Sequence, residues 1–516
     1  MHFTTIFRIY VLLIIIITTF PCFASNSYKT WTTSSMKKVF RESVPPEDIS
    51  KSEDLKLYAA RNEYVAGQVV IRAGENKLSG VTVSISDLTT QSGNTIESEQ
   101  FSLHKVAYVF LKAHNKYYPD PLPPLTERFN IKAGETQPIW IACVIPKTAK
   151  SGVYEGSVTI SVKGQSDRKI HFHLEVWNFA LPDDPILRNS FSSSFFPSEL
   201  EGVKSGSDER KAMVVRYFEY LLERRISPNS LPYPLDSPSA VKYLSDPRLS
   251  SIKFPRNSWR NSALIDYLEE NGWLAKSYVR IIDEPTKKER YDRIQSYGKT
   301  IDKVHPDLKQ LVCFNKGANV GGRTFWDWSG DNVQIWCPIT LWFSSPKVRA
   351  EATRRAQQGD EIWSYVCCDI APYTNFLIDG ADVETRITFW MLWKYRITGF
   401  LYWGTTSWKN GNPWITPNNN PSHPKRYGGG VLLYPGKPIG VLGPVTSIRL
   451  ENIRDGIEDY QYLYLFAKMS GTKKNSDKRV DKIIKTLKSY NHNPFELEKV
   501  RNKIGKLLSC EGCQGK

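Results

Sequence analysis

Short stretches in which apolar and polar residues alternate fill the chain from about residue 29 to residue 180. This two-residue period predicts β-strands with one buried face, and Gly- and Asn-containing turns separate the strands as in a β-sandwich. No residue set suited to catalysis accompanies them, so we interpret residues 25–180 as a support domain. The clearest strands are expected at 68–72, 81–85, 138–142, 154–162 and 169–176.

A proline-marked linker, Leu181–Pro185, ends this pattern, and strands then alternate with helices. Such alternation is typical of a parallel sheet or barrel. An eighth strand should lie between Pro234 and Asn261, where the pattern is weak. We therefore predict a distorted or incomplete (β/α)8 TIM-like barrel over residues 186–430. Its strands are expected at 189–196, 227–233, 278–283, 309–315, 333–339, 361–368 and 399–404, and its helices at 208–225, 262–271, 286–303, 345–358 and 382–396.

Residues 431–516 are expected to form a strand and a helical extension packed on the barrel. The helix that begins near Ile448 carries many charges, and these have opposite-charge partners at helical spacing. We interpret them mainly as a structural ion-pair network that docks the tail. The residues concerned are Arg449, Glu451, Arg454, Asp455, Glu458 and Asp459.

Two adjacent carboxylates, Asp283 and Glu284, stand where the apolar strand that starts at Tyr278 ends. Thr286 and Glu289 follow with the spacing of a helix capping box. In an α/β barrel this junction lies on the C-terminal face, where active sites are built. Two close like charges favour one protonated and one ionised carboxyl group, as acid–base catalysis requires. From these residues alone, a helix-capping or dipole role for Asp283 is an equal alternative.

Polar and aromatic residues also stand at the ends of the other expected strands, where a barrel would bring them together around the carboxylate pair. Aromatic faces, an amide and hydroxyl groups suit a sugar pocket. Any single Trp could instead fill the core beneath a loop, but the shared placement at strand ends favours a pocket. The candidate substrate-binding residues are Asn315, Trp336, Tyr365, Tyr402, Trp403 and Trp408.

The first 24 residues have the pattern of a secretory signal peptide, with Arg8, an apolar core at 9–17 and small residues before a cut after Ala24. The apolar core is too short to span a bilayer. Lipidation at Cys22 is disfavoured because Phe20 and Pro21 precede it. We expect a secreted or periplasmic protein without stable membrane insertion.

The formal net charge of +16 suits acidic glycans, a membrane surface or nucleic acid. Lysines are scattered, however, and no compact basic tract alternates with aromatic residues, so we expect a solvated surface and no nucleic-acid partner. Cys510 and Cys513 have the spacing of half a zinc site without a second pair. A terminal disulfide or two thiols is therefore favoured over a metal, and we expect no metal and no cofactor.

Several motifs, taken in order, resemble glycoside hydrolase family 123 and its close relatives. The resemblance covers about residues 180–465, and the preceding β-sandwich extends it toward the N-terminus. Asp-Glu-Pro alone is not specific, whereas the combination is. The motifs are Ile-Asp-Glu-Pro at 282–285, Trp-Ser-Tyr-Val-Cys-Cys at 363–368, Phe-Trp at 389–390, Ile-Thr-Gly-Phe-Leu-Tyr-Trp at 397–403 and Arg-Leu-Glu-Asn-Ile-Arg-Asp-Gly-Ile-Glu-Asp-Tyr at 449–460.

The resemblance implies a retaining exo-β-N-acetylgalactosaminidase that uses substrate-assisted catalysis, an exception to the scheme in which an enzyme carboxylate attacks the sugar. By motif, Asp283 would orient the 2-acetamido group, and Glu284 would protonate the leaving oxygen and then activate water. The two residues imply a 2-acetamido sugar, but they do not distinguish galacto from gluco configuration.

Two alternatives stay open at this point. A non-catalytic glycan-binding or surface-scaffold protein could keep the same fold, although the intact carboxylate pair speaks against it. A two-carboxylate retaining glycosidase would need a nucleophile on another strand, for which Asp369 is the nearest candidate. The oligomeric state does not follow from the sequence.

Overall fold

The structure is a computed structural model that describes residues 28–48, 53–193, 198–255, 257–315, 324–367, 371–418 and 426–510. The expected signal peptide, Asp369 and Cys513 lie outside the described residues, so the structure does not test what the sequence predicts for them. Within the described part, no helix is both long and apolar enough to cross a membrane.

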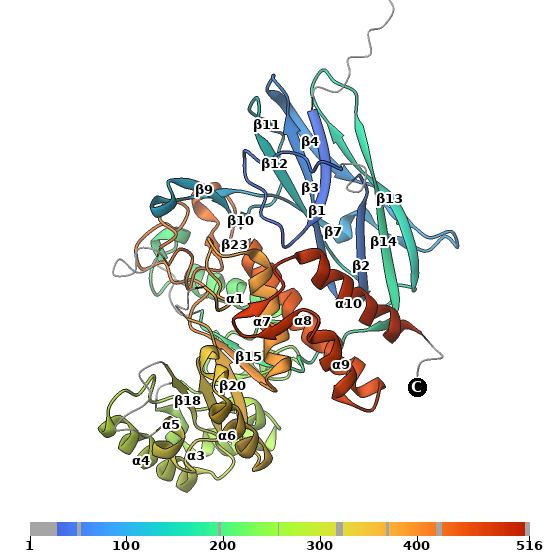
Figure 1. Ribbon diagram of the computed structural model, residues 1–516. Coiled ribbons are helices and arrows are strands. Elements are labelled where there is room, and N and C mark those ends of the chain that lie inside the picture. Colours follow the sequence, from blue (N-terminus) through green and yellow to red (C-terminus); the bar gives the residue numbers. More distant parts are fainter. Residues whose placement is uncertain are drawn as a thin grey trace, which may run out of the picture.

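The expected β-rich N-terminal domain is present and consists of two packed sheets (Figure 1). One sheet has the order β1 (Tyr28–Ser34), β3 (Tyr64–Ala73), β12 (Thr136–Val144) and β7 (Phe101–Lys105). The other has the order β11 (Phe129–Ile131), β4 (Leu78–Ile85), β13 (Gly152–Ser161), β14 (Arg168–Ala180) and β2 (Leu55–Arg61), with β5 (Leu88–Thr89) and β6 (Thr95–Ile96) at its side. Alternate apolar residues of both sheets, such as Ile71 and Phe172, share one core.

A second group of strands forms a half-barrel sheet of parallel strands. Its order is β15 (Arg188–Phe191), β21 (Gly399–Tyr402), β20 (Glu361–Tyr365), β19 (Ile335–Pro338) and β18 (Leu311–Phe314). Two short parallel strands, β16 (Ile252–Lys253) and β17 (Ser277–Tyr278), lie beside β18, because the Val279 amide donates to the Lys309 carbonyl at 2.9 Å. The strand that the sequence left undefined between Pro234 and Asn261 is therefore β16.

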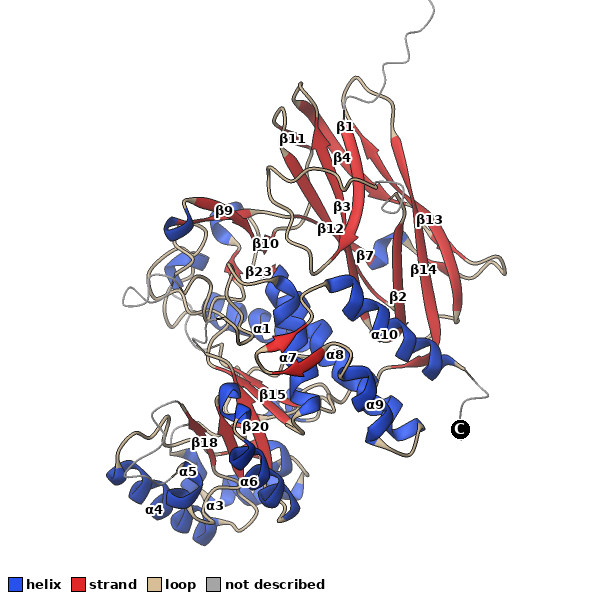
Figure 2. Cartoon of the chain, in the orientation of Figure 1, coloured by secondary structure: helices blue, strands red, loops and turns tan. Residues whose placement is uncertain are grey.

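Helices accompany these strands in the described segments before residue 400 (Figure 2). They are α1 (Asp208–Glu223), α2 (Pro238–Leu244), α3 (Ser262–Glu270), α4 (Lys288–Val304), α5 (Phe325–Ser329), α6 (Pro346–Gln357) and α7 (Asp382–Lys394). Two sequence predictions were wrong here. The strand expected at 227–233 is reduced to a single bridge at Pro228. Helix α4 has Lys287 as its N-cap without a side-chain bond, so Thr286 does not form the expected capping box.

The half-barrel sheet is buried on both faces, and each face has its own core. The outer core lies against the helices and contains Phe314, Trp336 and Tyr402. The inner core is smaller and consists of Tyr278, Leu311, Cys313, Ile335, Cys337, Ile339, Trp363, Tyr365 and Leu401. Cys313 and Cys337 thus behave as small buried hydrophobic residues.

The tail joins the two domains. It comprises β22 (Tyr434–Pro435), β23 (Pro444–Ser447), α8 (Ile448–Met469), α9 (Lys473–Val480), β24 (Ile484–Thr486), β25 (Ser489–Tyr490) and α10 (Pro494–Ser509). Helix α8 packs on α7 and α10, and α10 lies against β14 of the N-terminal domain (Figure 1). In addition, β23 pairs with β10 (Pro121–Leu122), which follows the hairpin of β8 (Tyr108–Leu111) and β9 (Lys116–Pro119).

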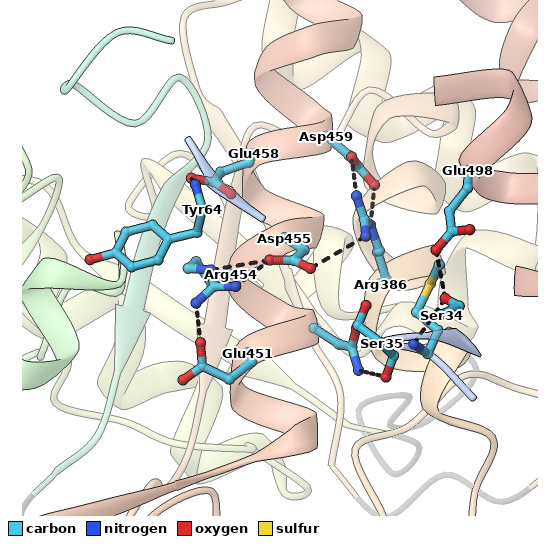
Figure 3. A network of polar contacts seen from close by, with 12 residues as sticks. Ser34, Ser35, Tyr64, Arg386, Glu451, Arg454, Asp455, Glu458, Asp459 and Glu498 are labelled. Atoms are coloured by element: carbon cyan, nitrogen blue, oxygen red, sulfur yellow. Dashed lines mark hydrogen bonds and ion pairs between the residues drawn. The ribbon is translucent and has the colours of Figure 1, made fainter. Parts of the chain in front are cut away.

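The charges of α8 form the expected structural network (Figure 3). Arg386 of α7 binds both oxygens of Asp459 at 2.7 and 2.9 Å and also reaches Asp455 at 3.3 Å. Arg454 binds Asp455 and, three residues earlier on the same helix, Glu451. A cavity of about 310 Å³ opens beside this network, between the N-terminal domain and the tail, but none of the predicted site residues lines it.

Candidate active site

Glu284 follows an extended stretch that continues from β17, and the regular alternation of side chains in this stretch stops just before it. Ile281 and Ile282 both pack on the outer side. The Asp283 backbone still pairs with Cys313 of β18, and the Glu284 amide donates to the Cys313 carbonyl at 3.1 Å. Glu284 itself has φ = 44°, a left-handed conformation that is unfavourable for a residue with a side chain. This turn aims its carboxylate at the inner face.

Two side chains from neighbouring strand ends hold the Glu284 carboxylate. Asn315, just after β18, donates from Nδ2 to Oε2 at 2.9 Å, and the hydroxyl of Tyr365, the last residue of β20, donates to Oε1 at 2.5 Å. Burial, with the neighbouring Cys313 and Glu284, raises the pKa of Tyr365, so its hydroxyl keeps the proton that it donates. Three strand ends therefore converge on one carboxylate, as the sequence predicted for these residues.

Asp283 is more exposed than its neighbour, with 56% of its side-chain surface accessible. Its Oδ1 lies 3.8 Å from Nη1 of Arg280, and its backbone carbonyl accepts from Arg290 at 2.7 Å. The two adjacent carboxylates thus have different surroundings. Glu284 is held by neutral donors, whereas Asp283 stands beside a cation at the open end of the half-barrel.

Two partly buried tryptophans follow strands of the half-barrel sheet, Trp342 after β19 and Trp403 directly after β21. The indole of Trp342 donates to the Asn315 carbonyl at 2.8 Å and so helps to place that residue. Trp403 packs against the outer core and lies so close to Gly430 that a Cβ there would be 2.4 Å from its ring. The buried Trp403 Nε1 has no hydrogen-bond partner among the described residues. Trp403 is among the residues predicted from the sequence, whereas Trp342 is not, because it lies beyond the expected end of the strand at 333–339.

Three of the predicted substrate-binding aromatics are core residues instead. Trp336 is fully buried against Phe314 and binds Asp360. Tyr402 and Trp408 are each 1% exposed, and the Trp408 indole donates to the Leu433 carbonyl at 2.9 Å. No face of these rings is open to a sugar, so their assignment to the pocket was wrong.

Among the described residues, one group of side chains has metal-ligand spacing, Glu269, His305 and Asp307. It lies at the end of α3 and in the connection before β18, away from the carboxylate pair. Both ring nitrogens of His305 have partners, Glu269 at 3.2 Å and the Asp307 amide at 3.2 Å. These hydrogen bonds therefore explain why the three side chains lie together, without a metal ion.

Two family descriptions match the chain. "Glycoside hydrolase 123, catalytic domain" matches residues 256–466, which include the carboxylate pair, Asn315 and Tyr365. "Glycoside hydrolase 123 N-terminal domain" matches residues 32–162, within the two packed sheets. The chain belongs to glycoside hydrolase family 123. It is therefore a glycoside hydrolase, and a glycan is its substrate.

The fold of this family 123 hydrolase is also found in a solved structure. A family 123 glycoside hydrolase from Clostridium perfringens, described in work on glycolipid glycan hydrolysis, has a TM-score of 0.71 and 14% identity, covering 94% of this chain and 98% of that one. A family 39 glycoside hydrolase from Bacteroides cellulosilyticus WH2 reaches only 0.30, with 11% identity and coverage of 81% and 82%. The latter likeness is too weak to carry an argument. A search of curated protein sequences finds no match.

Proposed function

We propose that this family 123 hydrolase removes terminal β-linked N-acetylhexosamine, with N-acetylgalactosamine preferred, and retains the configuration at C1. The observation that carries the proposal is the arrangement of Asp283 and Glu284 at the open end of the half-barrel, with Glu284 held by Asn315 and Tyr365. The glycolipid glycan hydrolysis described for the Clostridium perfringens relative supports a glycoconjugate substrate.

In the first step the oxygen of the sugar's 2-acetamido group attacks C1, and the bond from C1 to the leaving oxygen breaks. Glu284 gives its proton to that oxygen. Asp283 accepts a hydrogen bond from the acetamido N–H and stabilises the positive charge of the oxazolinium intermediate. In the second step ionised Glu284 takes a proton from water, and the water oxygen attacks C1 and restores the acetamido group. The donors Asn315 and Tyr365 fix the Glu284 carboxylate for both steps.

We further propose that the half-barrel sheet belongs to a distorted (β/α)8 barrel. Backbone hydrogen bonds support this proposal, since the Asn229 amide donates to Phe191 of β15 at 2.8 Å and the Lys253 amide of β16 donates to Asn229 at 3.1 Å. These bonds link the free edge of β15 to β16 through residues 227–229. The proposed barrel would place both carboxylates on its C-terminal face.

Secretion is also a proposal, and it rests on the apolar run at 9–17 and the small residues before Ser25. Protein recovered from the periplasm or the culture medium of a bacterial host should begin at Ser25. Retention of Met1 on protein confined to the cytoplasm would contradict the proposal.

The direct test compares nitrophenyl β-glycosides of N-acetylgalactosamine, N-acetylglucosamine and galactose. We expect release from the acetamido sugars only, with N-acetylgalactosamine fastest. Glu284→Gln should lower kcat about 10²–10⁴-fold, because a general acid–base is lost. Glu289→Gln, which removes an exposed carboxylate on α4, is the matched control and should keep full activity. Release from galactose, or full activity of Glu284→Gln, would contradict the mechanism.

A further inference from the structure

Lys253 points to the same inner face as the candidate active site. Strand β16 pairs with β17 in parallel register, with Lys253 beside Tyr278 and Ile252 beside Ser277. Tyr278 belongs to the inner core, whereas Ile252 packs with the helices outside. Because successive side chains of a strand alternate and paired neighbours share a face, Lys253 lies on the inner face.

Arg280 follows Tyr278 by two positions and extends the same face toward the carboxylate pair. Its Nη1 lies 3.8 Å from Oδ1 of Asp283 and 3.8 Å from Sγ of Cys313. The guanidinium, whose side chain is 22% exposed, therefore makes one long ion pair, with Asp283, in the described part of the chain. Arg280 and Lys253 therefore form a pair of cations beside the site.

Lys253 is the cation of this pair without a counterion of its own, because Asp283 lies beside Arg280. No ion pair or side-chain hydrogen bond joins the Lys253 ammonium to any described residue, and Glu284 is already held by Asn315 and Tyr365. Burial and the neighbouring Arg280 lower the pKa of Lys253, while Asp283 acts in the opposite direction. A partly buried ammonium without a counterion is costly, and an anion brought by a ligand would remove that cost.

We infer that the substrate of this hydrolase carries an anionic group near the scissile bond and that Lys253, with Arg280, binds it. The inference rests on the proposed function and names its substrate class, an acidic glycan. The anion is a sulfate ester on the terminal N-acetylhexosamine or the carboxylate of a uronic acid in the next sugar. Both accept charge-assisted hydrogen bonds from ammonium and guanidinium groups. The net charge of +16 favours the approach of such a polyanion.

The test measures kcat/KM for three substrates: the nitrophenyl β-glycoside of N-acetylgalactosamine, its sulfate ester, and a disaccharide in which the same sugar is linked to a uronic acid. The wild-type enzyme should prefer one anionic substrate over the neutral one by at least about 10-fold, the value of one charged hydrogen bond. Lys253→Met should reduce that ratio toward one. The anionic substrate whose preference depends on Lys253 shows whether the anion is a sulfate ester or the carboxylate of a uronic acid.

Lys276→Met is the matched control, since Lys276 is also partly buried but lies before the first residue of β17, at the other end of the strand. It should keep the wild-type ratio. Added sodium chloride should lower the ratio in wild type and leave it unchanged in Lys253→Met. Equal ratios in wild type and Lys253→Met, or no preference in wild type, would overturn the inference.

A binding measurement separates this inference from the proposed function. The methyl β-glycoside of N-acetylgalactosamine and its sulfate ester are titrated into Glu284→Gln and into the double variant with Lys253→Met. Binding at least about 10-fold tighter for the sulfate ester in Glu284→Gln, lost in the double variant, supports the anion site even if no glycoside is cleaved. Equal affinity for both sugars, with cleavage of the neutral substrate by wild type, refutes the anion site and leaves the proposed function standing.

Discussion

At the scale of single residues, the site depends on how one side chain is held. Glu284 adopts a left-handed backbone conformation that costs a non-glycine residue roughly 1–2 kcal/mol. The surrounding bonds maintain it, since the amide of Glu284 and both oxygens of its carboxylate are engaged. Strain of this kind is found at functional sites because it orients a side chain that regular structure would point elsewhere.

Tyr365→Phe should therefore lower activity without unfolding the protein. The change removes the hydroxyl that donates to Glu284 at 2.5 Å and leaves the ring in the inner core. A hydrogen bond to a charged group contributes about 1.5–3 kcal/mol, so we expect kcat/KM to fall about 10- to 100-fold. Steady-state kinetics with the nitrophenyl substrate measures the effect.

Tyr460→Phe is the control, because this buried tyrosine also loses one hydrogen bond, to the Ile397 carbonyl at 3.1 Å, far from Glu284 in the fold. Its activity should stay near the wild-type value. Equal activity of the two variants would mean that the Tyr365 hydroxyl does not position Glu284.

At the scale of elements, the sequence located most strands and helices to within a few residues but could not tell which face a side chain takes. In a parallel sheet buried on both sides, strands are apolar throughout, so no alternation marks the interior. Trp336 and Cys337 are neighbours, yet Trp336 packs outward and Cys337 inward. Lys253 was not predicted as a site residue. Only two residues of β16 pair with a neighbouring strand, and so short a strand leaves no pattern in the sequence.

Helix α8 shows the opposite case, in which the function of the charges and some partners on the same helix were predicted but the distant partners were not. Arg449 and Asp120 are fully buried and form a bidentate pair at 2.8 and 2.8 Å, although 329 positions separate them in the chain. Arg449 also binds the carbonyls of Phe376 at 2.7 Å and Gly428 at 2.8 Å. Local spacing on a helix cannot reveal such distant partners.

Arg449→Met should accordingly be strongly destabilising. The substitution leaves the Asp120 carboxylate buried without its cation, which typically costs about 3–5 kcal/mol. Arg354→Met is the matched control, because Arg354 makes an exposed pair with Glu351 on α6 whose loss typically costs up to about 1 kcal/mol. Urea unfolding followed by circular dichroism compares the two. Similar losses in both variants would show that the buried pair does not hold the tail.

At the scale of the whole molecule, tail and domains are joined through buried charges of both signs, and these make stability depend on pH. Burial raises the pKa of Glu384, at the start of α7, to about 7. Burial acts in the same direction on Glu451, but Arg454 and Arg224 outweigh it and lower the pKa of Glu451 to about 2. The two groups therefore have opposite effects on the pH dependence of folding.

Glu451 contributes stability that is present above the pKa of the unfolded chain and is lost as the pH falls toward about 2. Glu384 binds its proton more tightly in the folded protein. Its contribution is therefore complete at low pH and is lost as the pH rises through about 7. The free energy of unfolding should pass through a maximum between these limits and fall as the pH rises from about 5 to about 8.

Glu384→Gln should reduce that fall, because glutamine has no proton to lose in this buried position. Relative to wild type, the variant should gain on the order of 1–3 kcal/mol in unfolding free energy between about pH 5 and pH 8. Urea unfolding at a series of pH values measures the slope. Glu97→Gln, an exposed position in the N-terminal domain, should keep the wild-type slope. If Glu384→Gln keeps it as well, Glu384 titrates normally, and the pH dependence must come from the other buried carboxylates. Among these, burial raises the pKa of Glu458 on α8 to about 7 and that of Asp382 on α7 to about 6.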